Sequence, residues 1–194
     1  MRAARGRAIG LVFAAGGVHR AASSSFLRAA ACNERERVTA VPMTTGGTGE
    51  PQVFTVEEMM PHLQDVSGAV TKNLFLKDKK KKGLWLVSAR HDHQVNLNEL
   101  AKKLGVGSGN LRFADEAAML EKLKVGQGCA TALALLFDKD QSVKFVLDRD
   151  LVEGGHERIY FHPMTNSATM GLRPDDLVRF LKETGHEPIL ESFE

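Results

Sequence analysis

Lysines flank one apolar run of the sequence more densely than any other part of the chain. Lys72 precedes this run, and five more lysines follow it: Lys77, Lys79, Lys80, Lys81 and Lys82. Because Asp78 is the only acid among them, they create a local positive field. Such a field attracts phosphate, so we expect these lysines to contact an RNA backbone. The alternative is a solvated hairpin tip whose lysines bind nothing.

Two other stretches carry groups that suit chemistry on an ester or a ribose. Residues 161–169 (FHPMTNSAT) contain several polar side chains, and residues 126–131 (GQGCAT) form a loop with little side-chain cover. The polar side chains can line a small pocket that reads an amine or a hydroxyl, or they can cap the loop's own backbone. The amides of the glycine loop can face a carbonyl or an oxyanion, or the loop can be only a tight turn. The candidate binding residues are His162, Asn166, Thr169, Gly128, Cys129 and Ala130.

Familiar catalytic signatures are absent from the sequence, which holds no GxSxG, no HExxH and no P-loop. His91 and His93 form an HxH pair, but no convincing third ligand lies near them in the sequence. A solvated turn is therefore the favoured interpretation of this pair. We expect chemistry that uses neither a metal nor a cofactor.

The composition fits one globular domain with an additional segment at one end. The 194 residues are 43% hydrophobic and 26% charged, and the apolar runs are too short to span a membrane. Cys32 and Cys129 lie outside any CxxC motif, which argues against a disulfide framework and a cysteine zinc site and indicates a reducing compartment. Residues 1–53 hold seven arginines and three acids, which leaves 19 basic and 21 acidic residues in 54–194. Any RNA contact must therefore come from a local patch.

Residues 1–52 differ from the rest of the chain and are expected to form a disordered leader. Five arginines precede the first acid, Glu34, and the segment contains many alanines and serines. This composition is typical of a mitochondrial transit peptide, although a leader without any targeting role has the same appearance. We expect a cytoplasmic protein, or a mitochondrial one if the leader is a targeting signal. The turn-rich residues 44–51 (TTGGTGEP) read as a linker.

The remaining sequence alternates between short helical and short extended patterns, which predicts an α+β domain. We expect this domain to be a monomer. A capping box at residues 55–58 predicts a helix that continues to residue 63. Two apolar runs at residues 73–76 and 84–87, around the lysine-rich turn, predict a β-hairpin. Further helices are expected at residues 96–104, 117–123 and 174–182 and further strands at 132–137, 143–147, 158–161, 168–170 and 188–190. Together they predict a mixed, largely antiparallel sheet with helices at its margins.

Three motifs in order carry a resemblance to a known family: residues 71–78 (TKNLFLKD), 126–131 (GQGCAT) and 161–166 (FHPMTN). They resemble the aminoacyl-tRNA editing domains of the YbaK and prolyl-tRNA synthetase associated superfamily, in their free-standing eukaryotic form. The resemblance covers residues 53 to 194. It implies the α+β editing-domain fold and metal-independent hydrolysis, in trans, of misacylated proline tRNA. Alanyl-tRNA(Pro) is the implied substrate, and the acceptor end of the tRNA and prolyl-tRNA synthetase are the implied partners.

The resemblance also implies roles for single residues. Lys72 matches the family's essential lysine, which engages the 3′-terminal end of the tRNA, and Asn73 matches a position that helps to hold that end. His162 matches the residue that shapes the aminoacyl pocket and excludes larger side chains, and Gly128 matches the glycine of a GxxxP loop. In such domains the substrate's own ribose hydroxyl helps to activate water, and the protein positions and polarises. A pocket too small for proline is the feasible basis of selection, because one methylene alone discriminates by only about 1–3 kcal/mol.

Two departures from the family pattern favour a second interpretation. Ala132 stands where the GxxxP loop has its proline, and the first helix and strand of the family are not recognisable upstream of Phe54. The alternative is a noncatalytic module that binds aminoacyl-tRNA or a synthetase.

Overall fold

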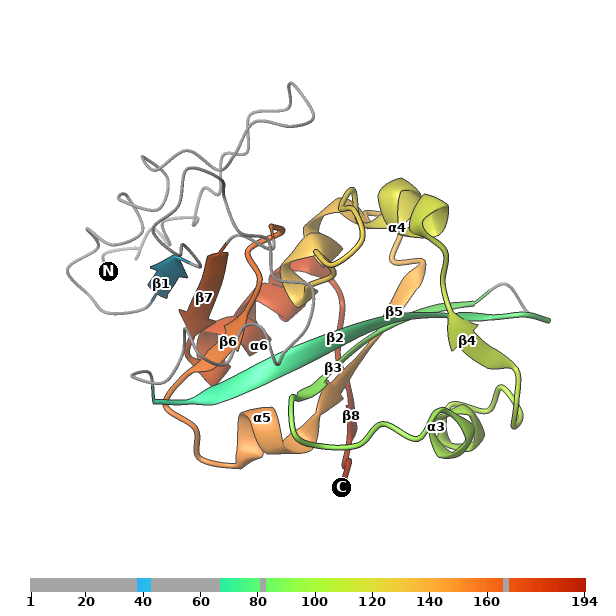
Figure 1. The fold of residues 1–194 in the computed structure, drawn as a ribbon, viewed down its shortest axis with the longest axis horizontal. Helices are drawn as coiled ribbons and strands as arrows, with labels where there is room; N and C mark the ends of the chain where they lie inside the picture. The colour runs from blue at the N-terminus through green and yellow to red at the C-terminus, as the bar shows by residue number, and fades with distance from the viewer. Residues whose placement is uncertain (1–37, 43–66, 81–82, 166–167) are drawn as a thin grey trace, which may run out of the picture.

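The computed structural model describes residues 38–42, 67–80, 83–165 and 168–194. Within these ranges the strands form one eight-stranded sheet with helices on both faces (Figure 1). Four strand pairings are antiparallel and three are parallel, which confirms the predicted α+β fold with its mixed, largely antiparallel sheet. The order across the sheet is β1 (Val38–Pro42), β7 (Ala168–Leu172), β6 (Ile159–Phe161), β2 (Ala69–Asp78), β3 (Leu84–Arg90), β5 (Val143–Asp148) and β8 (Ile189–Glu191), with β4 (Leu111–Phe113) paired to β2.

The predicted hairpin is the centre of this sheet. β2 and β3 pair antiparallel from Thr71 opposite Arg90 to Lys77 opposite Leu84. The backbone N–H of Asp78 donates to the carbonyl of Gly83 at 2.9 Å, which joins the two strands next to the turn. β2 is ten residues long, so its two ends reach different neighbours.

Side chains that alternate along the central strands build a separate core on each face of the sheet. Phe75, Leu86 and Phe145 lie on one face in a cluster with residues of η2, α5 and α6. Leu76 and Trp85 lie on the other face, in a cluster with residues of α3. The elements that cover the faces are α3 (Leu97–Lys103), α5 (Arg149–Glu153), the 3₁₀-helix η2 (Ala132–Phe137) and α6 (Pro174–Thr184).

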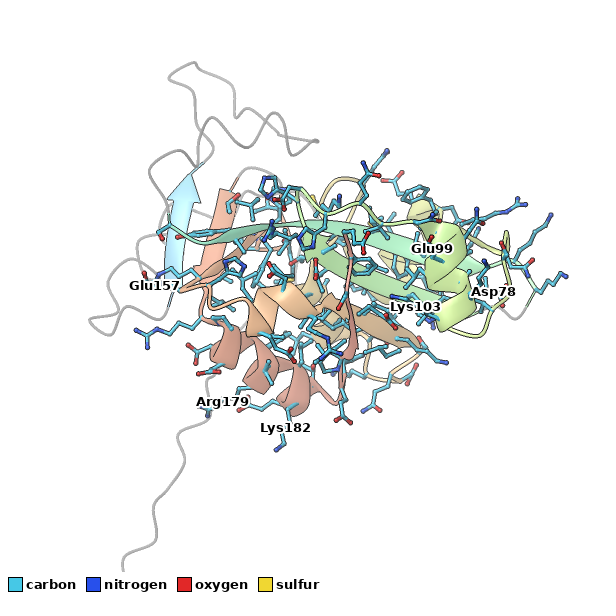
Figure 2. All side chains as sticks on the ribbon, turned by 90° about the horizontal axis from the view of Figure 1, so that it is seen from below. Asp78, Glu99, Lys103, Glu157, Arg179 and Lys182 are labelled. Atoms are coloured by element: carbon cyan, nitrogen blue, oxygen red, sulfur yellow. The ribbon has the colours of Figure 1, made fainter. Side chains whose placement is uncertain are left out.

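Three of the four helices expected from the sequence are present in the described residues, and their ends follow from local chemistry. The Asn96 side chain accepts from two backbone amides at the start of α3, and that of Asp115 accepts from the Ala118 amide at the start of α4 (Glu116–Lys122). α6 begins at Pro174 and ends at Gly185, whose left-handed backbone suits glycine. Figure 2 shows Arg179 and Lys182 on the outer side of α6.

The prediction of a strand at residues 132–137 is wrong. This segment is the 3₁₀-helix η2, and the Thr131 side chain caps it by accepting from the Leu133 amide at 3.4 Å. The run ALALLF contains no β-branched residue, and alanine and leucine favour helices. A short apolar run cannot be assigned to strand or helix from periodicity alone, and here the capping threonine decides.

The structure also contains elements that the sequence analysis did not predict. β1 lies inside the predicted leader and pairs antiparallel with β7, so part of residues 1–52 has regular structure. β4 and α5 are too short to give a periodic pattern, at three and five residues. The capping box and helix at residues 55–63 lie outside the described residues. No helix in the described part of the chain has the length and apolar character to cross a membrane.

Candidate functional site

A cavity of about 560 Å³ opens where the outer edge of β2 has no neighbouring strand. β6 pairs with Ala69 and Val70, and β4 pairs only from Leu76 onward. Among the described residues, no strand pairs with residues 71–75 at this edge. The cavity is lined by Thr71, Lys72, Asn73, Leu74, Phe75, Phe113, Ala114, Glu116, Met119, Gln127, Gly128, Ala130 and His162.

The backbone of Asn73 faces this gap. Along an antiparallel strand, successive residues direct their N–H and C=O groups to opposite edges. Ala69 donates its N–H to Arg158 of the β6 side, and the Phe75 carbonyl accepts from Ala114 of the β4 side. Asn73 lies between them in the same alternation, so its N–H and C=O point to the open edge.

The side chain of Asn73 is fixed by a short chain of hydrogen bonds. Its Oδ1 accepts from the Ser88 hydroxyl at 2.5 Å, and its Nδ2 donates to Thr71 Oγ1 at 3.5 Å. Thr71 Oγ1 in turn donates to the Tyr160 carbonyl at 2.9 Å. Ser88 and Thr71 are both buried. The amide is therefore held in one orientation at the cavity wall, and the Thr71 proton is already committed to a carbonyl.

The glycine loop forms a tight turn at the opposite wall. The Cys129 N–H donates to the Gly126 carbonyl at 3.1 Å, and Gly128 has φ +79°. A positive φ at the third position of a β-turn, without one at the second, defines a type II turn, which favours glycine there. Both Gly128 and Ala130 line the cavity, and their backbone N–H groups have no protein partner within the described ranges, which leaves these groups available to a ligand's acceptor.

His162 enters the cavity as a neutral imidazole. Burial lowers its pKa below the ordinary value of 6.5, and the backbone hydrogen bond to Ala168 only partly opposes this shift. Because a carbonyl oxygen can only accept, Nδ1 carries the proton and donates to Ala168 O at 3.1 Å. Nε2 is then a lone-pair acceptor with no partner among the described residues. The ring can accept a hydrogen bond from a ligand, and it carries no charge that would repel a cation.

Lys72 also lines the cavity, but its ammonium group is engaged elsewhere. Nζ donates to the backbone carbonyl of His91 at 3.2 Å and to that of His93. Both carbonyls belong to the segment that connects β3 to α3. One of the three N–H donors of the ammonium group remains for a ligand. Lys72 therefore joins the cavity wall to the neighbouring loop.

The predicted phosphate contacts lie next to the cavity rather than in it. Lys77 forms an ion pair with Asp115, and this lysine lowers the pKa of that carboxyl group. Lys79 and Lys80 are exposed at the hairpin end, while Lys81 and Lys82 lie outside the described residues. The exposed Arg112 lies opposite Lys77 on β4 and adds a positive charge that the sequence analysis did not include.

The structure brings together five of the predicted site residues in the cavity wall: Lys72, Asn73, Gly128, Ala130 and His162. Cys129 and Thr169 do not line it; Cys129 packs against the core and Thr169 is fully buried. Asn166 lies outside the described residues. Sequence reasoning missed the contributions of β4 and α4, chiefly Phe113, Glu116 and Met119. No local motif marks these three residues, so only an alignment with the family could have identified them.

These features define a class of protein: an α+β domain with a preformed pocket made of backbone amides, a fixed side-chain amide and a neutral imidazole. The chain belongs to the aminoacyl-tRNA editing domain family, whose sequence model matches residues 50–180.

Named relatives agree with this family, and a solved structure shares the fold. The chain is 67% identical over 159 residues to prolyl-tRNA synthetase associated domain-containing protein 1 of Bos taurus, covering 82% of this chain and 92% of that protein. It is 35% identical over 134 residues to the prolyl-tRNA editing protein ProX of Acetoanaerobium sticklandii, covering 69% and 79%. A crystal structure of a hypothetical protein has the same fold, with a TM-score of 0.60 and 19% identity over 88% of this chain and 98% of that one.

Proposed function

We propose that this chain hydrolyses the ester between a small amino acid and proline tRNA, with alanyl-tRNA(Pro) as the substrate. The observation that carries the proposal is the pocket, whose wall combines a glycine turn, two backbone amides without a protein partner in the described ranges, and the fixed Asn73. A relative at 35% identity is named a prolyl-tRNA editing protein, which supports the choice of tRNA. We propose that its partners are the acceptor end of the tRNA and prolyl-tRNA synthetase.

The pocket suits attack by water rather than by a protein nucleophile. The described lining contains no serine and no cysteine, and its one hydroxyl, that of Thr71, donates to the Tyr160 carbonyl. An aminoacyl ester is already activated, so it needs chiefly orientation and stabilisation of the developing oxyanion. The free N–H groups of Gly128 and Ala130 are the donors that we assign to this oxyanion.

His162 and Asn73 suit the amino end of the substrate. The α-ammonium group of an aminoacyl ester is a donor and a cation, so a neutral ring with an open Nε2 can accept from it. The outward carbonyl of Asn73 offers a second acceptor at the open strand edge. We propose that these two acceptors hold the amino acid while the glycine turn polarises its carbonyl.

The cavity as a whole is too large to exclude proline by size, so selection against proline must act in a smaller part of it. At about 560 Å³ the whole cavity has the volume of a typical small-molecule site and is larger than any amino-acid side chain. We propose that the side chain occupies the part bounded by His162 and Ala130, and that the remainder receives the terminal nucleoside.

The test is deacylation of alanyl-tRNA(Pro), with prolyl-tRNA(Pro) as the control substrate. Release of alanine alone is expected. Lys72→Ala should abolish release. Lys103→Ala on α3, which removes an ion pair with Glu191 of β8 and a hydrogen bond to the Ser192 carbonyl away from the cavity, should not. Because Lys72 also satisfies two carbonyls, its removal can lower stability, so the unfolding free energy of both variants must be measured beside the rate. Equal release of alanine and proline would contradict the proposal.

One observation favours the noncatalytic binding module as a second candidate. Two of the three N–H donors of Lys72 are occupied by protein carbonyls, which is an arrangement suited to holding a loop. A folded chain that binds alanyl-tRNA(Pro) without releasing alanine would establish this candidate and exclude the hydrolase.

A further inference from the structure

An aromatic ring stands exposed at the rim of the cavity. Phe113 is the last residue of β4, lines the cavity and is 62% exposed, more than the other large apolar side chains noted as exposed in the described ranges. Single exposed apolar residues are common in proteins, so exposure alone assigns no role. The neighbourhood of this ring is what makes it informative.

The ring lies in a row with two other cavity residues. Phe113 is opposite Leu76 on β2, so it stands on the same face as Leu74 and Lys72, which alternate along that strand. Leu76 is buried, whereas Phe113 is the last residue of β4 and its ring is left exposed by the described residues. From Asn73 to the level of Phe113 the strand advances by three residues, which is about 10 Å.

Positive charge lies near the ring. Arg112 precedes Phe113 and lies opposite Lys77, so these two side chains point to the other face of the sheet. The exposed Lys79 and Lys80 follow at the end of the hairpin. In Figure 1 the hairpin of β2 and β3 continues past β4. An exposed aromatic ring with cationic side chains nearby is a combination that binds single-stranded nucleic acid, by stacking a base and contacting the backbone.

We propose that Phe113 stacks on a nucleobase of the single-stranded 3′ end of the tRNA, while the hairpin lysines contact the phosphates. This inference rests on the proposed function, because it places the base beyond the ester held at Asn73 and the glycine turn. Phe113 is then a binding residue for the RNA and takes no part in the chemical step.

Kinetics give the first test. Phe113→Ala should raise KM for alanyl-tRNA(Pro) about 5- to 150-fold and leave kcat nearly unchanged, as expected for loss of one stacked base. Phe113→Leu, which keeps an apolar side chain but has no ring, should behave in the same direction. Val178→Ala, which trims an exposed apolar side chain on α6, is the matched control and should change neither constant. An unchanged KM for Phe113→Ala would overturn the inference.

Fluorescence gives a test that does not depend on catalysis. In Phe113→Trp, the new indole should be accessible to acrylamide in the free protein, whereas the native Trp85 is buried. Uncharged tRNA(Pro) should quench the new fluorescence, and the same tRNA without its single-stranded 3′ end should not. Equal quenching by both RNAs, or an indole shielded before RNA is added, would overturn the stacking. Quenching without any deacylation would retain the stacking and reject the hydrolase.

Discussion

Two glycines of the same turn should respond differently to alanine, and the difference can be worked out from the backbone. Gly128 has φ +79°, a conformation that costs an L-residue about 1–2 kcal/mol. Gly126 has no positive φ, and a Cβ built on it would find its nearest neighbour, Glu116 Oε1, at 3.8 Å. Gly128→Ala should therefore lower the unfolding free energy by about 1–2 kcal/mol, and Gly126→Ala should leave it within about 0.5 kcal/mol.

Urea unfolding followed by the fluorescence of the buried Trp85 measures these free energies. If the turn holds the oxyanion donors, Gly128→Ala should also slow deacylation under conditions in which the variant remains folded, because the turn must tilt its amides to accept a Cβ. Gly126→Ala should retain the native rate. Equal stability of the two variants would refute the assignment of a type II turn, and equal rates would refute the use of its amides in catalysis.

Three further predictions concern single residues. The pKa of His162 lies below 6.5, so deacylation should persist at pH 6.5 and decline only as the pH falls through the lowered pKa. Because the fold favours the neutral imidazole, the unfolding free energy should also decrease as the pH falls below 6.5. In a pH series of rates and urea midpoints, His162→Gln should remove both dependences. Ala132→Pro should be tolerated better than Leu133→Pro in thermal unfolding, because residue 132 begins η2 after an extended Thr131, whereas the Leu133 amide donates to the threonine hydroxyl. Asp138→Ala should cost about 1–3 kcal/mol in urea unfolding, because it removes the acceptor of the buried Val143 amide, now bonded at 2.7 Å; equal stability would show that the hydrogen bond contributes nothing.

Local chemistry made much of the fold predictable. Asn96 and Asp115 cap helices that the sequence placed within a residue or two, and the lysine-rich turn predicted the β2–β3 hairpin. The prediction failed where the local signal was ambiguous or too short, as in η2 and in the three-residue β4. β1 was missed because its pairing with β7 depends on a partner about 130 residues away in the chain. No local pattern contains such a pairing.

The candidate site was predictable only in part, for a related reason. Asn73, Gly128 and His162 are on three separate segments, and their resemblance to a family placed them together before any geometry was known. Phe113 and Arg112 belong to a strand whose position is set by its pairing with Leu76 and Lys77. The predicted role of Lys72 gave no indication that its ammonium group would bind the carbonyls of the next loop.

The location of the cavity follows from the unequal lengths of the strands. β2 has ten residues, while its outer neighbours β6 and β4 have three each and pair only with its two ends. Within the described residues, no strand pairs with the middle of β2 at this edge, and buried backbone groups of this kind need a partner. A ligand with its own donors and acceptors, such as an aminoacyl ester, can supply those partners without any rearrangement of the sheet. Lengthening β4 by three residues, up to the position that would pair with Asn73, would close this edge. A short strand that the sequence barely signals therefore determines whether the site exists.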